Sequence, residues 1–183
     1  MTYCVLVKDQ TASMNVDSYN RTARAGSAVD ISNGNVFRLD TINSSGSGAE
    51  VWTVSAPTLS GSTMDKLWMA GEADTVVTTV SGTLKYRGLN QDPRNFYIPG
   101  GDIFSAFKPQ IGDIITITAD GFTGTAALAY ANSTDGAYTF TTSASVQANS
   151  LTLKYLATTY ISIGTGNIGS HRVTAYQYVV HNN

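Results

Sequence analysis

Short runs of β-branched and aromatic residues, separated by turn residues, recur along the whole chain and constrain its fold more than any other feature. Residues 90–122 show this pattern most clearly. Asp102 can cap a short helix over residues 102–108, and Pro109 prevents that helix from continuing. The β-branched residues 114–118 favour a strand. This segment therefore predicts a loop, a short helix and a strand in that order.

The number and spacing of such runs predict the fold class. About ten short runs separated by turns are typical of a sandwich or barrel. We therefore expect an all-β fold, a sandwich or barrel of about ten short, mainly antiparallel strands, with one short helix near residues 102–108. The dipeptide Asn33-Gly34 predicts a hairpin that joins residues 28–31 to residues 36–39. Further strands are expected at 2–8, 51–54, 75–80, 83–86, 125–130, 138–142, 151–156, 159–163 and 172–180, and residues 67–70 fit either a strand or one helical turn.

The length of the chain suits a single domain. A domain of 183 residues buries enough surface for a core without disulfides. We expect one β domain over residues 1–183 and leave open a subdivision near residue 121. Residues 9–27 lack a hydrophobic period and are expected to form an extended arm or loop. That segment is either a surface connection or one that becomes ordered against a partner, because loops of this length usually have a task.

The charge pattern argues against two classes of partner. Only 13% of the residues are charged, the formal net charge is -2, and the basic residues form no run. Nucleic-acid binding is not expected from such a pattern. No apolar run is long enough to span a bilayer, and the first ten residues lack the features of a signal peptide. We expect synthesis in the cytoplasm and no membrane partner.

A glycine motif near the C-terminus matches a nucleotide-binding fingerprint in letters only. Residues 164–169 read G-x-G-x-x-G, but residues 172–180 that follow are strand-like. A dinucleotide fingerprint must open a helix inside a βαβ unit. The motif therefore predicts a hairpin loop.

The remaining reactive residues do not form a catalytic or metal-binding pattern. Cys4 is the single cysteine and is expected to pack in a strand, and His171 and His181 have no zinc-ligand spacing with it. No nucleophile motif is present. We expect no enzymatic activity, no cofactor and no metal. Four aspartates adjoin glycine or proline, or lie close to them, and are expected to stabilise turns: Asp92, Asp102, Asp113 and Asp120.

Arginine and aromatic residues outside the expected strands are the candidates for a partner interface. These residue types are enriched at interface centres. Trp52 and Trp68 are expected in the core, the usual place for rings in β proteins. The candidate interface residues lie in the expected arm and in the proline-bounded loop: Tyr19, Arg21, Arg24, Arg87, Arg94, Phe96 and Tyr97.

Four segments together resemble a known family. They are DISNGNVFRLD at residues 30–40, Glu50-Val51-Trp52, residues 67–70, and DPRNFYIPGGDIFSAFKPQIGDIITIT at residues 92–118. Their order is similar to that of the decoration, or head-stabilising cement, proteins of tailed bacteriophages. The resemblance covers residues 28–118, roughly half the chain, and the part after residue 121 resembles no pattern.

The resemblance implies a function. Proteins of this family are small, all-β and non-enzymatic, and they bind the outside of a capsid where capsomers meet, often as trimers. A ligand of the assembled shell stabilises that shell. We therefore expect a virion structural protein on the capsid exterior that is made in the bacterial cytoplasm. It would bind the major capsid protein through the arm and one face, and form a homo-oligomer, with a trimer favoured.

Two other functions stay open at this point. A tail-tube or head-fibre component would share the same composition and would form rings or fibres when purified alone. A carbohydrate-binding β-sandwich would expose Trp52 and Trp68 as a flat platform.

Overall fold

The computed structural model describes residues 3–43, 50–59, 66–72, 78–80, 83–85, 93–163 and 171–183. Within these ranges the fold is all-β, which confirms the predicted class, and the helical segments are short 3-10 turns. The elements are β1 (Leu6–Gln10), η1 (Ala12–Met14), η2 (Asp17–Tyr19), β2 (Asn20–Arg24), β3 (Val36–Asn43), β4 (Val51–Ser55), β5 (Trp68–Ala70), β6 (Thr78–Val80), β7 (Thr83–Lys85), η3 (Pro93–Asn95), β8 (Ile103–Phe107), β9 (Ile114–Thr118), η4 (Ala119–Gly121), β10 (Phe122–Thr123), β11 (Tyr130–Ser133), β12 (Phe140–Ser143), β13 (Thr152–Ile163) and β14 (His171–Asn182).

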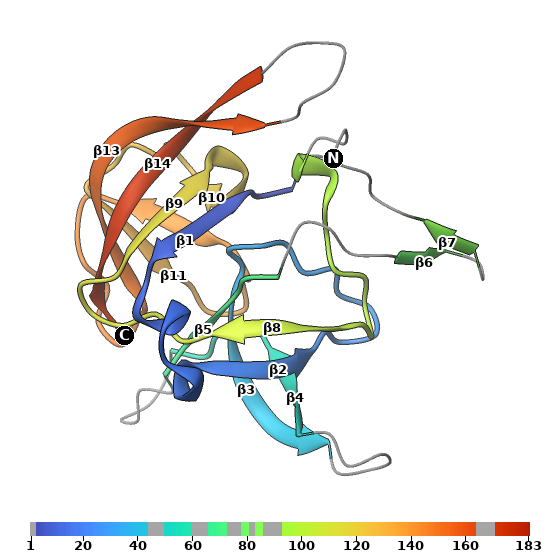
Figure 1. Ribbon diagram of the computed structural model, residues 1–183. Helices are drawn as coiled ribbons and strands as arrows, with labels where there is room; N and C mark the ends of the chain where they lie inside the picture. Colours follow the sequence, from blue (N-terminus) through green and yellow to red (C-terminus); the bar gives the residue numbers. More distant parts are fainter. Residues whose placement is uncertain are drawn as a thin grey trace.

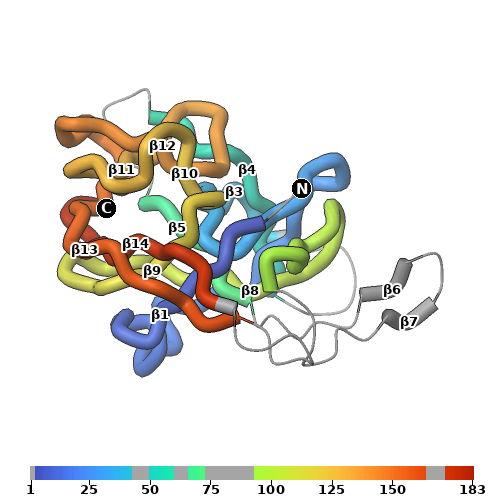
Figure 2. The backbone as a smooth tube through the Cα atoms, turned by 90° about the horizontal axis from the view of Figure 1, so that it is seen from above, coloured from blue at the N-terminus to red at the C-terminus, as the bar shows by residue number. Residues whose placement is uncertain are grey.

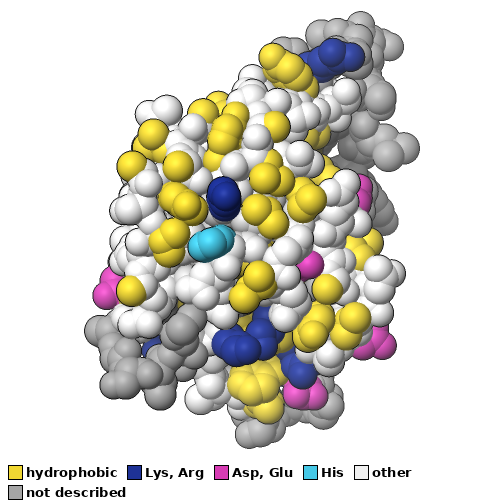
Figure 3. Space-filling view, turned by 90° about the vertical axis from the view of Figure 1, so that its left-hand side faces the viewer, with side chains coloured by type: hydrophobic (Ala, Val, Ile, Leu, Met, Phe, Trp, Pro, Cys, Tyr) yellow, Lys and Arg dark blue, Asp and Glu magenta, His cyan; other side chains and the backbone are white. Residues whose placement is uncertain are grey.

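A seven-stranded sheet forms one side of the molecule (Figure 1). Its strand order is β1-β9-β14-β13-β11-β12-β10, and every neighbouring pair is antiparallel except β10 and β12. Strands β13 and β14 are twelve residues long and pair along their whole length. Figure 3 shows the outer face of this sheet, where hydrophobic side chains are widespread and charged ones are few.

A closed barrel of five short strands lies beside that sheet (Figure 2). The barrel order is β2-β4-β3-β5-β8. Strands β2 and β4 are parallel, and the other pairs are antiparallel. Closure leaves no open edge, so short strands with few apolar residues can still form a stable unit. Strands β6 and β7 pair antiparallel in a separate two-stranded sheet.

The barrel and the sheet share a hydrophobic core. Phe107 and Met69 of the barrel pack in the same cluster as Ile117 and Tyr178 of the sheet. Residues before and after position 121 thus bury each other in one cluster. A second cluster fills the barrel and consists of Ala23, Ala25, Ile31, Phe37, Val54, Ala70, Phe96, Ile98, Phe104 and Ala106.

Residues 102–108 form a strand, so the predicted helix is wrong. Strand β8 pairs with β2 along five residues and closes the barrel. Phe104 and Ala106 alternate with exposed Ile103 and Ser105, which is the period of a strand. The hydrogen bonds to β2 and β5 outweigh the local capping signal of Asp102, because those strands are distant in sequence and a local pattern does not contain them.

The predicted hairpin at Asn33-Gly34 is half correct. A turn forms there, with Gly34 at φ +83 and the Asn35 amide donating to the Ser32 carbonyl at 3.0 Å. The preceding segment does not pair with β3, however. Ile31 instead forms an isolated bridge with Ile98, while β3 pairs with β4 and β5. The turn dipeptide therefore predicted the reversal of the chain but not the pairing partner.

The expected arm contains a strand of the barrel. Asp9 and Gln10 belong to β1, and residues 20–24 form β2 between β8 and β4. The 3-10 turns η1 and η2 lie between these two strands. Ala23 is the single fully buried side chain of β2, which explains why its sequence carries so weak a hydrophobic pattern.

Other predicted strands shift or merge. Residues 151–156 and 159–163 belong to one strand, β13, with a register shift between Tyr155 and Ala157. The strand predicted at residues 125–130 is wrong for most of that range. Residues 126–129 lie in turns and bends, and strand β11 begins at Tyr130. The glycine motif at 164–169 lies outside the described residues. The strands on either side of it pair antiparallel, with Ile163 opposite His171.

Because of Tyr178, the free energy of unfolding should depend on pH in the alkaline range. Its buried hydroxyl donates to the Ala126 carbonyl, and burial, followed by the nearby Tyr155 and Tyr176, raises the pKa of this phenol. The folded chain keeps this proton above pH 10, where the unfolded chain releases it. The free energy of unfolding should be insensitive to the group below about pH 10 and fall above it by up to about 1.4 kcal/mol per pH unit.

Urea unfolding between pH 9 and pH 11, as approximate limits, measures this dependence. Tyr178→Phe should remove that part of the alkaline slope, while Tyr160→Phe, at an exposed position, should leave it unchanged. Equal slopes in the parent chain and Tyr178→Phe would contradict the assignment.

Candidate functional site

Three basic side chains gather where strands β2 and β8 meet the start of β5. We call Arg21, Lys66 and Lys108 the basic patch. The pKa of Lys108 lies below its usual value, first because of partial burial and then because of the positive charges of Lys66 and Arg21. Mutual repulsion of this kind is relieved when an anionic group binds.

Strand pairing brings the members of the basic patch together. Asn20 on β2 lies opposite Phe107 on β8, and the Lys108 amide donates to the Tyr19 carbonyl at 2.8 Å. These bonds hold the start of β2 against the end of β8. Lys66 precedes β5, which pairs with the other edge of β8.

Arg21 is held in place by its neighbours. Its guanidinium lies over the Trp68 ring, 5.9 Å from the ring centroid, and its Nη1 donates to the Asn20 carbonyl at 2.9 Å. Trp68 is half-buried against the barrel core. A cation over an indole ring is attracted to the face of the ring. The Trp68 ring therefore holds the charge of Arg21 at a defined position.

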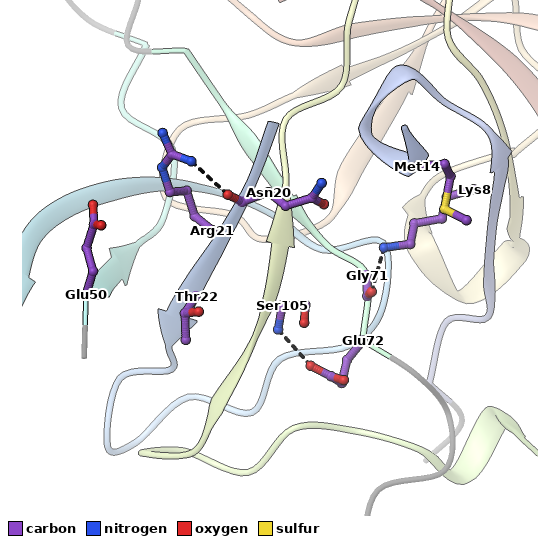
Figure 4. A pocket seen from close by; sticks show the side chains of 9 residues that line it. All are labelled: Lys8, Met14, Asn20, Arg21, Thr22, Glu50, Gly71, Glu72 and Ser105. Carbon is purple, nitrogen blue, oxygen red and sulfur yellow. Dashed lines mark hydrogen bonds between the residues drawn. The ribbon is translucent and has the colours of Figure 1, made fainter. Parts of the chain in front are cut away.

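A groove of about 770 Å³ adjoins the basic patch (Figure 4). Lys8 and Met14 lie on one side of it, and Arg21 and Glu50 lie on the other. The full lining consists of Lys8, Met14, Asn20, Arg21, Thr22, Glu50, Gly71, Glu72 and Ser105.

Two charged groups in this groove are tied to the backbone. Lys8 Nζ donates to the Gly71 carbonyl at 2.9 Å and lies 5.1 Å from the Phe107 ring centroid. Burial lowers the pKa of Lys8, and the negative charge of Glu72 partly opposes that shift. The Glu72 carboxylate accepts the Ser105 amide at 2.7 Å. Both groups thus stabilise the chain at the end of β5.

Apolar side chains border the patch and the groove. Met14 on η1 is 52% exposed, and Val16, just before η2, is also exposed. The Asn20 side-chain amide donates to the Ser13 and Val16 carbonyls at 2.7 and 3.1 Å. These bonds fix the two 3-10 turns beside the basic patch. Exposed methionine next to arginine and tyrosine is a composition typical of protein interfaces.

The interface residues predicted from the sequence fall into two separate groups. Tyr19, Arg21 and Arg24 lie on η2 and β2, and only this group borders the basic patch. The second group lies beside the N-terminus, at the other end of the molecule in Figure 1. There the Tyr3 amide donates to the Arg94 carbonyl at 2.6 Å. The structure therefore does not bring the two groups together.

Phe96 is a core residue, which corrects its assignment to an interface. It is 1% exposed and packs in the barrel cluster, because the segment that carries it pairs with Ile31 through Ile98. Tyr97 stacks on Tyr3 with ring centroids 4.7 Å apart and is half-buried. Arg87 lies outside the described residues.

Arg24 differs from Arg21 in its surroundings. It lies opposite Ile103 on β8, and its buried Nε has no hydrogen-bond partner among the described residues. Arg24 is therefore partly enclosed by the barrel wall, whereas Arg21 faces the groove.

Sequence analysis missed several residues of the site. Lys8, Lys66, Glu72 and Lys108 come from separate segments and have no motif in common. Only the pairing of β2, β5 and β8 makes them neighbours, so no local signal could have identified them.

The predicted structural roles of Asp113 and Cys4 agree with the structure. The Asp113 carboxylate accepts the Gln110 amide at 2.8 Å and the Ala12 amide at 2.9 Å, and Cys4 is buried in the core. Within the described ranges, no three His, Cys, Asp or Glu side chains gather as a metal site would require.

Comparisons with known proteins identify no relative of this chain. No helix in the part of the chain that the structure describes is long and apolar enough to cross a membrane. No family model, curated protein or solved structure matches the chain significantly.

Proposed function

We propose that this chain is a non-enzymatic virion structural protein that binds the outside of a phage capsid and stabilises contacts between capsomers. The observation that carries this proposal is the basic patch, set beside exposed Met14 and Val16 on a rigid β framework. Residues 28–118 also resemble phage decoration proteins. A protein of this kind needs a fixed contact surface and no catalytic group.

The proposed partner is an acidic surface of the major capsid protein. The chain has a formal net charge of -2, so its patch of three cations contrasts with the molecule as a whole. Such a local contrast orients a partner during encounter and speeds association at low salt. Met14 and Val16 would then supply the apolar contact area beside the charges.

The proposal includes the location and the assembly of the protein. It would be synthesised in the bacterial cytoplasm and added to the capsid exterior, where copies would assemble as a homo-oligomer, with a trimer around a symmetry axis of the shell favoured. Neither nucleic acid nor membrane is a proposed partner. Removal of residues 9–27 is not a suitable test, because it would delete strand β2 of the barrel.

The geometry favours neither of the other functions. Trp52 and Trp68 lie on β4 and β5, which are separated in the barrel by β3, so they do not stand side by side as a sugar platform would require. A tail-tube or head-fibre protein would assemble by itself into rings or fibres, and the solution mass distinguishes that case.

Arg21→Glu should weaken capsid binding by about tenfold or more, because it reverses one of the three charges of the patch. Binding would be measured by co-sedimentation with expanded, DNA-free capsids of the phage whose genome encodes the chain, at low and high salt. The fold should tolerate the change, since the new carboxylate would lie near Lys66 and Lys108.

Two matched variants serve as controls. Arg21→Lys keeps the charge and should bind nearly as well as the parent chain. Arg172→Glu makes the same charge change at an exposed position on β14 and should leave binding unchanged. Failure of the folded parent chain to co-sediment would overturn the proposal, and spontaneous formation of rings or long polymers would assign the chain to the tail or a fibre.

A further inference from the structure

Strand β13 has an edge that no other described strand covers along most of its length. It pairs with β14 over its full length, but β11 covers its other edge only at residues 152–154, with one more bond from the Tyr155 amide to the Ala129 carbonyl. Among the strands that the structure describes, none lies against residues 156–163 on that side. Figure 1 shows β13 and β14 continuing past the rest of the sheet as a two-stranded ribbon.

The sequence of this edge lacks the usual protection against strand pairing. Residues 156–163 read LATTYISI, with no charge and no proline, and they are rich in β-branched residues. Proteins normally shield exposed edges with lysine, proline or a bulge. The register shift between Tyr155 and Ala157 lies where the free edge begins, and the strand continues regularly from there to Ile163.

Two large side chains of the edge are also exposed. Tyr160 is 62% exposed and Leu156 is 45% exposed. Backbone amides and carbonyls in such a row form hydrogen bonds with any strand of suitable shape, and apolar side chains on both strands then bury each other. The edge therefore has both the hydrogen-bonding groups and the apolar surface of a strand-addition site.

We propose that residues 157–163 of two copies of this chain pair antiparallel across a two-fold axis at Tyr160, so that their ribbons form one continuous sheet. A second copy is the occupant that the edge fits best, because the segment is self-complementary. It presents the same uncharged, β-forming row to itself, and no like charges meet. The seven paired residues span roughly 24 Å, and Tyr160 of one copy lies opposite Tyr160 of the other.

This contact differs from the proposed capsid contact. A two-fold contact joins two copies and then closes, so it forms neither a ring nor a fibre. It uses the ribbon of the sheet, whereas the basic patch belongs to the barrel strands and the segments that flank them. The inference does not depend on the capsid proposal, and its test contains no capsid.

The test is the solution mass of the purified chain, measured by light scattering behind a sizing column over a series of concentrations. The parent chain should shift from monomer to dimer as concentration rises. The double variant Thr158→Lys with Tyr160→Lys should raise the dimer dissociation constant by about tenfold or more, because lysines of the two copies would face each other. Both positions are exposed and lie opposite uncharged Tyr176 and Thr174 on β14.

A control variant adds the same charge elsewhere. Ile111→Lys with Val146→Lys changes two exposed apolar residues in loops away from the ribbon and should dimerise like the parent chain. Hydrogen exchange on the unmodified chain provides an independent measurement. The amides of residues 157–163 that point away from β14 should gain protection as concentration rises, while those of exposed loop 144–149 should not.

The possible results separate clearly. Loss of the dimer in the β13 variant alone, together with concentration-dependent protection of the edge, would support the proposal. A parent chain that stays monomeric at all concentrations would overturn it. The proposal would also be overturned if the β13 variant dimerised like the parent chain. The same holds if the exchange rate of the edge amides did not change with concentration.

Discussion

Phe107→Ala is expected to lower the free energy of unfolding by about 3–5 kcal/mol, the range for removing a buried aromatic side chain. Phe107 is fully buried where the barrel meets the seven-stranded sheet. It lies opposite Asn20 on β2 and Met69 on β5, so the cavity would open at the point where three barrel strands join. Urea unfolding followed by tryptophan fluorescence measures the loss.

The surroundings of Phe107 leave little room for the site to collapse. A Cβ added at Gly71 would lie only 2.8 Å from the Phe107 ring, which shows how closely the backbone of β5 approaches it. Lys8 would also lose the aromatic face beneath its ammonium group. Phe107→Leu, which keeps most of the volume, should cost about 1.5 kcal/mol or less. A loss below about 1 kcal/mol in Phe107→Ala would contradict the shared core.

Asp113→Ala is expected to cost about 2–4 kcal/mol, because two backbone amides would lose their acceptor. The carboxylate of Asp113 is buried and accepts from Gln110 in its own turn and from Ala12 on η1. These bonds join the loop before β9 to the segment that carries Met14. Urea unfolding gives the loss, and hydrogen exchange at Ala12 should show its amide opening locally.

The same substitution links stability to the candidate interface. If η1 is no longer held by Asp113, Met14 and Val16 should lose their fixed positions beside the basic patch, and capsid binding should weaken in a chain that is still folded. Asp17→Ala is the matched control, because Asp17 is exposed and should change stability by no more than about 0.5 kcal/mol. Equal unfolding energies for the two alanine variants would show that Asp113 is not a structural anchor.

Part of the candidate site was accessible to sequence reasoning. Tyr19 and Arg21 were selected because arginine and tyrosine outside the expected strands are typical of interfaces, and Arg21 lines the groove beside the basic patch. The same rule also selected Phe96, which is buried. Composition indicates which residue types suit an interface, but burial depends on what packs against them. That information lies in segments distant in the chain.

The sequence by itself determined the local features of this protein. Runs of β-branched residues separated by turns produced an all-β fold, Asn33-Gly34 produced a reversal of the chain, and Asp113 stabilises its own turn. Each depends on residues that are neighbours in sequence, and their preferences act over a few bonds.

Only the tertiary structure decided which strands pair. The pairing of β2 with β8 joins Asn20 to Phe107, converts a predicted helix into a barrel strand, and places Arg21, Lys66 and Lys108 on one surface. It also leaves residues 156–163 of β13 without a neighbouring strand in the described part of the chain. The physical reason is that strand partners form hydrogen bonds between residues far apart in sequence. Their choice depends on burial and closure of the whole barrel and not on local preference.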